Sequence, residues 1–284
     1  MFELILENVN GDQLSFAQNS PFTVTEIEGL NPPDATINMS ELALIDGAKY
    51  NSAKVNIRTI NIAFAIEYAA AENRIEVYKV LKSKQYVKMI YNGSIRHVYA
   101  EGYIESIQIS YFEMKQIVTC NILCPSPYFK DVQDMVEDLS SIIKSFHFPF
   151  ASTAEPEIVF GYYGGMVGID IENNGDVECG LIIQIYVRNA VTNPKIFDYI
   201  TNEYFGFTYS LQRGDLVTID TRKGYKSVKL LRGAVETNLF NYIMQGSTWL
   251  QLPTSGSTYV YEVGSGSTAS LNITFTHTNL YEGV

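Results

Sequence analysis

Alternation between apolar and polar residues with a period of two runs through most of this 284-residue chain and constrains its fold more than any other feature. The stretches FELILEN, KQIVTCNILC and SLNITFTH show it, and Gly, Asn, Asp or Pro residues interrupt it at short intervals. Successive side chains of a β-strand point to opposite faces, so such stretches form strands with one apolar and one polar face. We therefore predict a mainly β protein with many short strands.

The segment 53–67, AKVNIRTINIAFAIE, alternates but changes phase. Val55 and Ile57 are apolar at odd positions, whereas Ile60 and the apolar residues after it occupy even positions. A shift of one residue turns the apolar face of a strand over. We predict a β-bulge near Arg58–Thr59, because one inserted residue restores the face.

One segment of the first half has a helical period. In AAENRIEVYKVLKSK, Ile75, Tyr78 and Leu81 recur every three residues with polar residues between them. This spacing predicts an amphipathic helix with these three residues as its apolar face. The first half is thus predicted to be an α+β domain, a curled sheet or barrel with one helix packed on it.

Two prolines follow the last alternating stretch of the first half, in ILCPSPYFKD. Pro125 and Pro127 have no backbone N–H to donate, so the sheet must stop after Cys124. Tyr128 and Phe129 are predicted to anchor the departing chain. These four residues form the expected interdomain junction.

The chain is predicted to divide into two domains with a short connector. The N-terminal domain covers residues 1–130, and an acidic connector with an aromatic end, 131–153, follows it. A flexible tether would be rich in Gly and Ser, so we expect this connector to dock on the protein. Residues 154–284 show the short, evenly spaced strands of a β-sandwich.

Composition and charge argue against several classes of function. Twenty Lys and Arg against 31 Asp and Glu leave a net charge of −11, which argues against binding nucleic acid through its phosphates. We expect no signal peptide, because acids flank the first short apolar run, and no apolar run is long enough to span a membrane. Cys120 and Cys124 lie four residues apart in one predicted strand, too far to pair, and Cys179 belongs to a different segment, so we expect three reduced, structural thiols.

The candidate catalytic and metal sites are all weak. The segment DIENNGDVECGL approaches a calcium loop, but Leu181 stands where the bidentate Glu should be, and a hairpin turn explains NNGD better. Cys120 and Cys124 with three scattered His residues lack zinc spacing. Glu101 and Glu105 are better explained as acids on a solvated strand face than as a glycosidase pair. We expect no catalytic residue, no metal and no cofactor.

Several segments together resemble one known family. NPPDATIN before a strand, CPSPYFKD at the end of the first domain, FHFPF at the junction, and NNGDVECG, NPKIF, GDLVTIDTRKGYKSVKLL and NYIMQGSTWLQL in the second half are similar in order to the phage distal tail protein (Dit) family. The resemblance covers essentially the whole chain.

The resemblance implies a structural, non-enzymatic protein of the virion, made in the host bacterial cytoplasm and placed at the phage tail tip. The N-terminal domain would assemble into a hexameric hub ring, and a C-terminal galectin-like β-sandwich would form an outer collar. Implied partners are other copies of the chain, the tail tube protein, a tail-tip or tail-fibre protein and receptor-binding or baseplate proteins. DNA would pass through the lumen, and no membrane is involved.

Ring assembly needs contact surfaces, which we expect in the phase-changing strand and in a loop over residues 28–52. The candidate interface residues are apolar or aromatic: Pro32, Pro33, Ile45, Tyr50, Ile57 and Ile60. The 20 tyrosines suit such surfaces, because a tyrosine is apolar at one end and hydrogen-bonds at the other. An acidic lumen would keep DNA from adhering.

An alternative function is carbohydrate binding by the sandwich domain during attachment to the host cell surface. Trp249, Tyr259 and Tyr261 could stack against sugar rings. Trp249 also alternates with Leu250 and Leu252 in STWLQL, and a place in the sandwich core is the interpretation we prefer for it.

Overall fold

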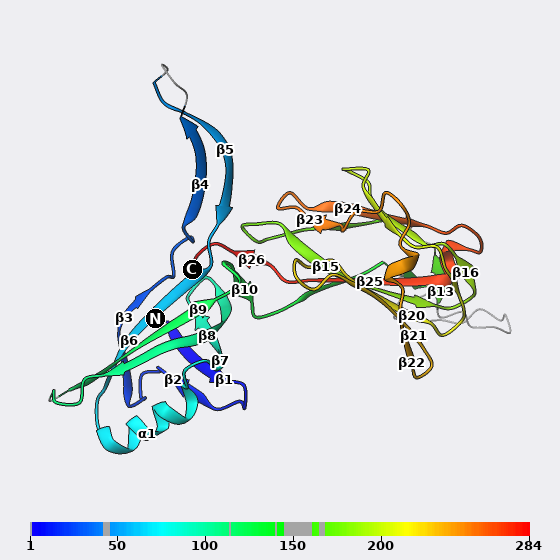
Figure 1. Ribbon diagram of the computed structural model, residues 1–284. Helices are drawn as coiled ribbons and strands as arrows, with labels where there is room; N and C mark the ends of the chain where they lie inside the picture. Colours follow the sequence, from blue (N-terminus) through cyan, green and yellow to red (C-terminus); the bar gives the residue numbers. More distant parts are fainter. Residues whose placement is uncertain (1, 42–45, 114, 140, 145–160, 165–167) are drawn as a thin grey trace. The chain divides into compact units, whose positions relative to one another are not determined.

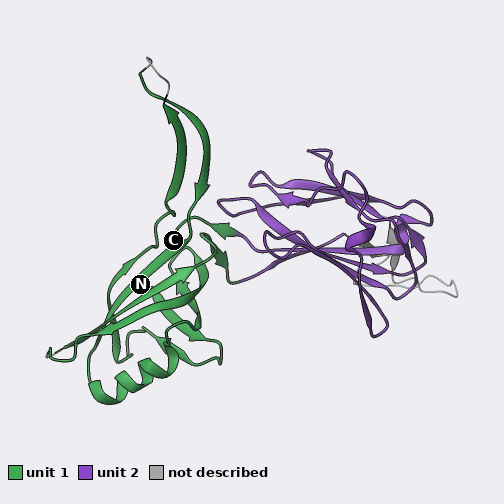
Figure 2. Cartoon of the chain, viewed as in Figure 1, with its two compact units in different colours: residues 1–132, 280–284 green, residues 133–279 purple. Residues whose placement is uncertain are grey.

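The computed structural model describes residues 2–41, 46–113, 115–139, 141–144, 161–164 and 168–284. Antiparallel sheets dominate the described chain, and α1 (Ala70–Val80) is its one α-helix within those ranges, so the mainly β prediction is confirmed. Two compact units divide it: unit 1 contains residues 1–132 and 280–284, and unit 2 contains 133–279 (Figures 1 and 2). The chain therefore passes between the units twice.

Unit 1 is built on one sheet with strand order β2-β1-β7-β8-β9-β6-β3 and a short pair, β10 and β26, beside β8. A separate two-stranded sheet, β4–β5, leaves it. The strands are β1 (Glu3–Asn8), β2 (Gln13–Ser15), β3 (Phe22–Glu28), β4 (Ala35–Glu41), β5 (Ala48–Val55), β6 (Arg58–Ile66), β7 (Tyr86–Asn92), β8 (His97–Ile109), β9 (Gln116–Cys124), β10 (Phe129–Asp131) and β26 (Leu280–Tyr281).

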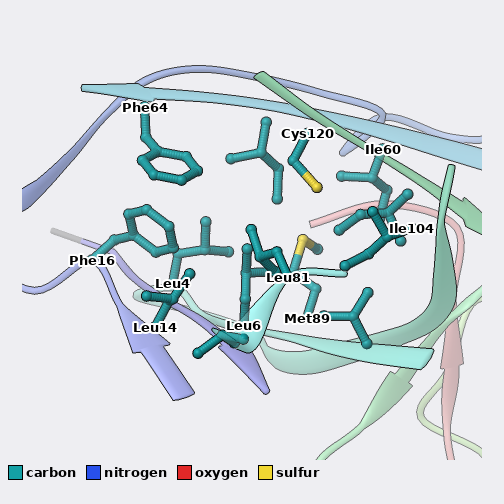
Figure 3. Close-up of a cluster of buried hydrophobic side chains, with 14 of the residues drawn as sticks. Leu4, Leu6, Leu14, Phe16, Ile60, Phe64, Leu81, Met89, Ile104 and Cys120 are labelled. Atoms are coloured by element: carbon teal, nitrogen blue, oxygen red, sulfur yellow. The ribbon is translucent and has the colours of Figure 1, made fainter. Parts of the chain in front are cut away.

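The alternating residues of these strands fill the core of unit 1. The inward residues of β6, which are Ile60, Ile62, Phe64 and Ile66, are almost fully buried, and Phe16 and Phe22 meet Phe64 edge-on at 4.9 and 5.7 Å between ring centroids. Figure 3 shows leucines of β1 and β2, Met89 of β7, Ile104 of β8 and Cys120 of β9 converging on the same interior. Side-chain alternation along the strands supplies most of this core, and the helix segment adds Val77, Val80 and Leu81.

The helix packs on this core through a different face from the predicted one. Val77, Val80 and Leu81 are buried, whereas Ile75 is 52% exposed and Tyr78 is partly exposed. A three-residue spacing drifts around a helix of 3.6 residues per turn, so Ile75, Tyr78 and Leu81 do not share one face for long. Of the predicted face, Leu81 alone reaches the core.

The predicted bulge near Arg58–Thr59 is wrong. Residues 58–66 pair with β9 in unbroken register, and the phase changes because β5 ends at Val55 and β6 begins at Arg58. The two phases belong to two strands with different environments. Bulges occur instead at Val24/Glu26, Asn38/Met39 and Ile104/Ser106.

Unit 2 is a set of short antiparallel strands in several sheets. One sheet has the order β11-β25-β15-β20-β21-β22, and another has β14-β24-β17-β18. The strands are β11 (Met135–Asp138), β12 (Ser141–Lys144), β13 (Gly161–Gly164), β14 (Gly168–Ile171), β15 (Cys179–Val187), β16 (Val191–Thr192), β17 (Lys195–Asp198), β18 (Tyr204–Gly206), β19 (Ser210–Leu211), β20 (Leu216–Asp220), β21 (Ser227–Arg232), β22 (Val235–Asn238), β23 (Gln251–Leu252), β24 (Ser257–Glu262) and β25 (Leu271–His277), with 3-10 turns η1 (Phe240–Tyr242) and η2 (Thr268–Ser270).

The segments on either side of each passage between the units are paired strands. In unit 1, β10 pairs with β26, and in unit 2, β11 pairs with β25. Met135–Asp138, which the sequence assigned to a connector, is thus an edge strand of unit 2, and Leu280–Val284 belongs to unit 1. The FHFPF segment, 146–150, lies outside the described residues.

Candidate functional site: an exposed hairpin and the cluster at its base

The β4–β5 hairpin has one apolar and one polar face. Ile37 pairs with Ala53 and Met39 with Tyr50, so their side chains lie on one face. The bulge at Asn38/Met39 leaves Asn51 without a partner in the register, and it brings Tyr50 opposite Met39. We call Ala35, Ile37, Met39, Tyr50, Ala53 and Val55 the hairpin face.

The opposite face of the hairpin is held by polar side chains. Asn38 donates to Ser52 at 3.0 Å, and Asn51 donates to Ser40 at 2.6 Å. Lys49 and Lys54 lie at positions of this face, paired with Ser40 and Thr36. These contacts fix the pairing of the two strands, but they do not cover the apolar side.

Among the described residues of unit 1, the hairpin face is left largely uncovered, and Val55 at its base is half-buried. Ile37, Met39 and Tyr50 are 54, 59 and 60% exposed, and every residue of β4 is exposed. Figure 1 shows the hairpin leaving the body of unit 1 as a free arm. A two-stranded hairpin alone is marginally stable in water, and an exposed apolar patch marks an interaction surface.

Arg58 lies at the base of this hairpin and is 3% exposed. Its guanidinium donates to the backbone carbonyls of Gly29, Asn31, Pro127 and Glu282, at 2.8 Å for Asn31, 2.7 Å for Pro127 and 2.5 Å for Glu282. The guanidinium carbon lies 4.2 Å from the centre of the Phe129 ring. One buried cation thus joins the segment before β4, the segment before β10 and the C-terminal segment.

Burial shapes the chemistry of this cluster. Desolvation lowers the pKa of Arg58 from its ordinary value, although nearby Cys124 and Glu282 act in the opposite direction. The group still stays charged at neutral pH, because a guanidinium does not lose its proton in proteins. Its role is therefore mechanical: it satisfies carbonyls that would otherwise be buried without donors.

Close backbone approach supports the same cluster. Gly29 has φ +87°, and a Cβ there would lie 2.2 Å from the carbonyl oxygen of Thr59. Only glycine fits this position without a shift of β6. The C-terminal segment adds its own contacts, since Val284 N donates to Leu30 O at 3.2 Å and the guanidinium carbon of Arg96 lies 4.5 Å from the Tyr281 ring centre.

The predicted junction residues fall in this cluster. β9 ends at Cys124, as the two prolines predict, and Pro127 accepts a hydrogen bond from Arg58. Phe129 is fully buried beneath Arg58, whereas Tyr128 is half-buried and Pro125 is exposed. Sequence reasoning missed Arg58 itself. The sequence pattern could have indicated that Arg58 is buried, because Arg58 is in phase with the buried residues Ile60 and Ile62.

The predicted interface residues are spread over different environments. Tyr50 lies on the hairpin face, and Ile57, 60% exposed, lies where the hairpin joins β6. Pro32 is exposed and Pro33 half-buried just before β4. Ile45 lies outside the described residues. Ile60 is buried in the core of unit 1, where no partner can reach its side chain.

The predicted sugar-stacking residues do not form a platform. Tyr259 is fully buried and Tyr261 is 6% exposed, because both occupy inward positions of β24; their hydroxyls donate to the carbonyls of Gln251 and Thr268 at 3.0 Å. Trp249 is half-buried, with its ring centre 4.9 Å from that of Phe205. Trp249 therefore packs against Phe205, but it is not one of the buried core residues as Leu250 and Leu252 are.

Metal and thiol chemistry find little support in the described chain. In the calcium-like loop, the Asn173 side chain donates to the carbonyls of Val177 and Leu252 and accepts a hydrogen bond from the backbone N–H of Gly175. No group of three or more His, Cys, Asp or Glu side chains in the described ranges is arranged to hold a metal. Burial raises the pKa of Cys120 and Cys179 to about 12 and that of Cys124 to about 11, so these thiols are poor nucleophiles.

No helix in the described part of the chain is both long and apolar enough to cross a membrane.

Comparison with known proteins gives a family for the second half of the chain. Residues 174–281 match the family described as siphovirus-type tail component, C-terminal domain, whose model carries the name SPP1 Dit. No curated protein sequence matches the chain.

Solved structures match the fold over the whole chain. The crystal structure of the Dit protein of phage SPP1, described as a paradigm of the hub adsorption apparatus in phages infecting Gram-positive bacteria, has a TM-score of 0.68 at 14% identity and covers 98% of each chain. Chains of the phage P2 baseplate, in its activated conformation with calcium or strontium, have TM-scores of 0.51 at 14% identity and cover 100% of each chain.

Proposed function

We propose that this chain is a Dit-type tail component, on the match of residues 174–281, and that it forms a hexameric hub ring joining the tail tube to the tail tip. In this proposal the chain is a structural tail protein and not an enzyme. In this proposal, unit 1 builds the ring and unit 2 forms the outer collar. The proposed partners are the tail tube protein and a tail-tip or fibre protein.

The exposed hairpin face is the observation that supports ring assembly. At ~3.3 Å per residue, the seven residues of β4 extend roughly 23 Å from the body of unit 1. Such an arm reaches a neighbouring copy, and its apolar face becomes stable only when another surface covers it. A hairpin face that contacts a different surface on the next copy makes a heterologous contact, and such contacts close into rings when the rotation fits.

The net charge agrees with a DNA conduit. A chain with a charge of −11 repels phosphates, so a ring of such chains would let DNA pass without adhering. The proposal therefore includes an acidic lumen. A lumen lined by Lys and Arg in a ring structure would contradict that part of it.

The carbohydrate-binding alternative receives no specific support, because Tyr259 and Tyr261 are buried. Negative-stain images of the purified chain, with its mass in solution, test the ring proposal. Rings or stacked pairs of rings support it. Particles of open filaments, or closed dimers at every concentration, would contradict a hexameric hub.

A further inference from the structure

Unit 1 is built from two pieces of chain that unit 2 separates. Residues 1–132 come first, unit 2 follows as residues 133–279, and residues 280–284 then return to unit 1. We call residues 280–284 the return segment. Figures 1 and 2 show its end beside the base of the β4–β5 hairpin. Unit 1 is therefore complete only after the chain has passed through unit 2.

The first part of the return segment is fixed on the body of unit 1. Its strand, β26, pairs with β10 in antiparallel register. The Tyr281 ring packs against the buried core of unit 1, and its hydroxyl donates to Asp131 Oδ2 at 3.1 Å. The guanidinium carbon of Arg96 lies 4.5 Å from the centre of the same ring. These contacts give the return segment a firm seat.

Hydrogen bonds join the last part of the return segment to the chain just before β4. The Arg58 guanidinium donates to the Glu282 carbonyl at 2.5 Å and to the Asn31 carbonyl at 2.8 Å, so it bridges the two segments. Val284 N donates to Leu30 O at 3.2 Å, which adds a direct backbone contact. The return segment thus holds the backbone from which the hairpin leaves unit 1.

The two segments also pack closely at Gly283. A Cβ at this position would lie 3.1 Å from the Leu30 carbonyl oxygen and 3.3 Å from Cδ of Pro32. Beyond Pro32, the base of the hairpin is closed by Asn56 N, which donates to Asp34 O at 2.9 Å. A larger side chain at position 283 would therefore push on the segment that leads into this base.

We propose that the return segment is a latch that fixes the base of the β4–β5 hairpin after unit 2 has been made. Because synthesis begins at the N-terminus, residues 1–132 leave the ribosome before unit 2, and the return segment leaves after it. The base of the hairpin is thus the last part of unit 1 to be completed. The hairpin face is the proposed ring contact, so a chain with an open latch would present a loose arm and assemble poorly; this consequence rests on the proposed function.

Two substitutions weaken the latch outside the buried core of unit 1. Gly283→Val places bulk against Leu30 and Pro32, and Val284→Pro removes the N–H that donates to Leu30. Hydrogen exchange with mass spectrometry compares the full chains with the wild type at a concentration below assembly. Exchange of Asn56 and of the β4–β5 amides should become faster by about fivefold or more, the effect of losing one hydrogen bond. Exchange of β9 and β25 should stay as in the wild type.

Val284→Ala is the matched control. It shortens a side chain that is 39% exposed and keeps the donating N–H, so its exchange should equal that of the wild type. Unchanged exchange of Asn56 in both latch variants, or an equal rise in the control, would overturn the latch. A uniform rise that includes β9 would overturn it as well, because the return segment would then stabilise all of unit 1 and not the hairpin base.

Particle mass by light scattering, at a concentration where the wild type assembles, separates this inference from the ring proposal. Faster exchange with loss of ring-sized particles supports the latch and its effect on assembly. Faster exchange with unchanged particles supports the latch and overturns that effect. If the wild type stays monomeric at every concentration, the ring proposal fails, and the exchange rates alone decide for or against the latch.

Discussion

The β4–β5 hairpin and the β6–β9 pair are both antiparallel strand pairs with alternating side chains, but their apolar faces have different surroundings. Ile60, Ile62 and Phe64 of β6 are fully buried by the rest of unit 1. Ile37 and Met39 of β4 are more than half exposed. Alternation therefore predicts that one face of a strand pair is apolar and packs against another surface. It does not predict whether that surface belongs to the same chain or to a partner.

The largest effect is expected in the covered pair. Phe64→Ala removes a ring that meets Phe16 and Phe22, so the free energy of unfolding of unit 1 should fall by about 3–5 kcal/mol. Chemical denaturation of the purified protein measures this loss. Phe64→Leu serves as the control and should retain much of the stability. A loss below ~1 kcal/mol for Phe64→Ala would remove the contrast between the two pairs.

A smaller effect is expected where the two pairs join. Arg58→Met keeps the apolar stem but leaves several buried carbonyls without a donor, so unfolding should become easier by about 2–3 kcal/mol. Increased amide exchange of Asn31 and of the C-terminal segment should accompany it. Arg96→Met, which removes the hydrogen bond to the Gly283 carbonyl and the packing on the Tyr281 ring, is a milder control. Unchanged exchange at these segments would contradict a clamp role for Arg58.

Unit 2 contains a buried group, His277, whose protonation should make stability depend on pH. Burial lowers the pKa of His277 in β25, although the Glu137 carboxylate opposes this shift. The unfolded chain then binds the proton more readily, so stability is full above about pH 6.5 and falls below it, by at most about 1.4 kcal/mol per pH unit. Thermal unfolding between pH 8 and pH 5 measures the slope. His277→Gln should flatten it; an unchanged slope would assign the acid sensitivity to other groups.

The smallest effect on unfolding is expected in the uncovered pair. The double substitution Ile37→Ser and Met39→Ser changes side chains that lie in water in the single chain, so monomer stability should change by no more than about 0.5 kcal/mol. Denaturation at a concentration below assembly measures it. A loss as large as that of Phe64→Ala would show that the hairpin face is covered within its own chain.

Much of the fold was predictable because alternation is a local signal. The strand that ends at Cys124 follows directly from residue types. The hairpin turn predicted at NNGD is wrong, because β14 pairs with β24 and β15 pairs with β20, β23 and β25, so the strands before and after NNGD belong to different sheets. The buried face of α1 was not predictable from a three-residue spacing. Ile75 and Val77 are both apolar, and only the packing of the folded domain decides that Val77 is buried and Ile75 exposed.

The site was less predictable, because it depends on contacts between distant segments. Arg58 meets Gly29, Pro127 and Glu282, which lie up to 224 residues away in sequence. The prediction of a bulge at Arg58 treated the phase change as a defect of one strand. The inward phase of Arg58 pointed instead to a buried cation that needs several acceptors.

The predicted loop over 28–52 illustrates the same limit. NPPDATIN contains two prolines and was expected to lead from a loop into a strand, which β4 confirms. Ala48–Val55 returns as β5, so most of the segment is a hairpin. Of the hairpin face, the sequence named Tyr50 alone as a candidate contact, because the common face depends on a bulge that the sequence does not reveal.

The mass of the assembly in solution tests the central claim, that the hairpin face holds copies of this chain together. Light scattering is applied to the wild type and to the Ile37→Ser/Met39→Ser variant at equal concentrations. The account predicts a ring-sized particle for the wild type and a folded monomer for the variant. Ring-sized particles of equal mass from both proteins would contradict it.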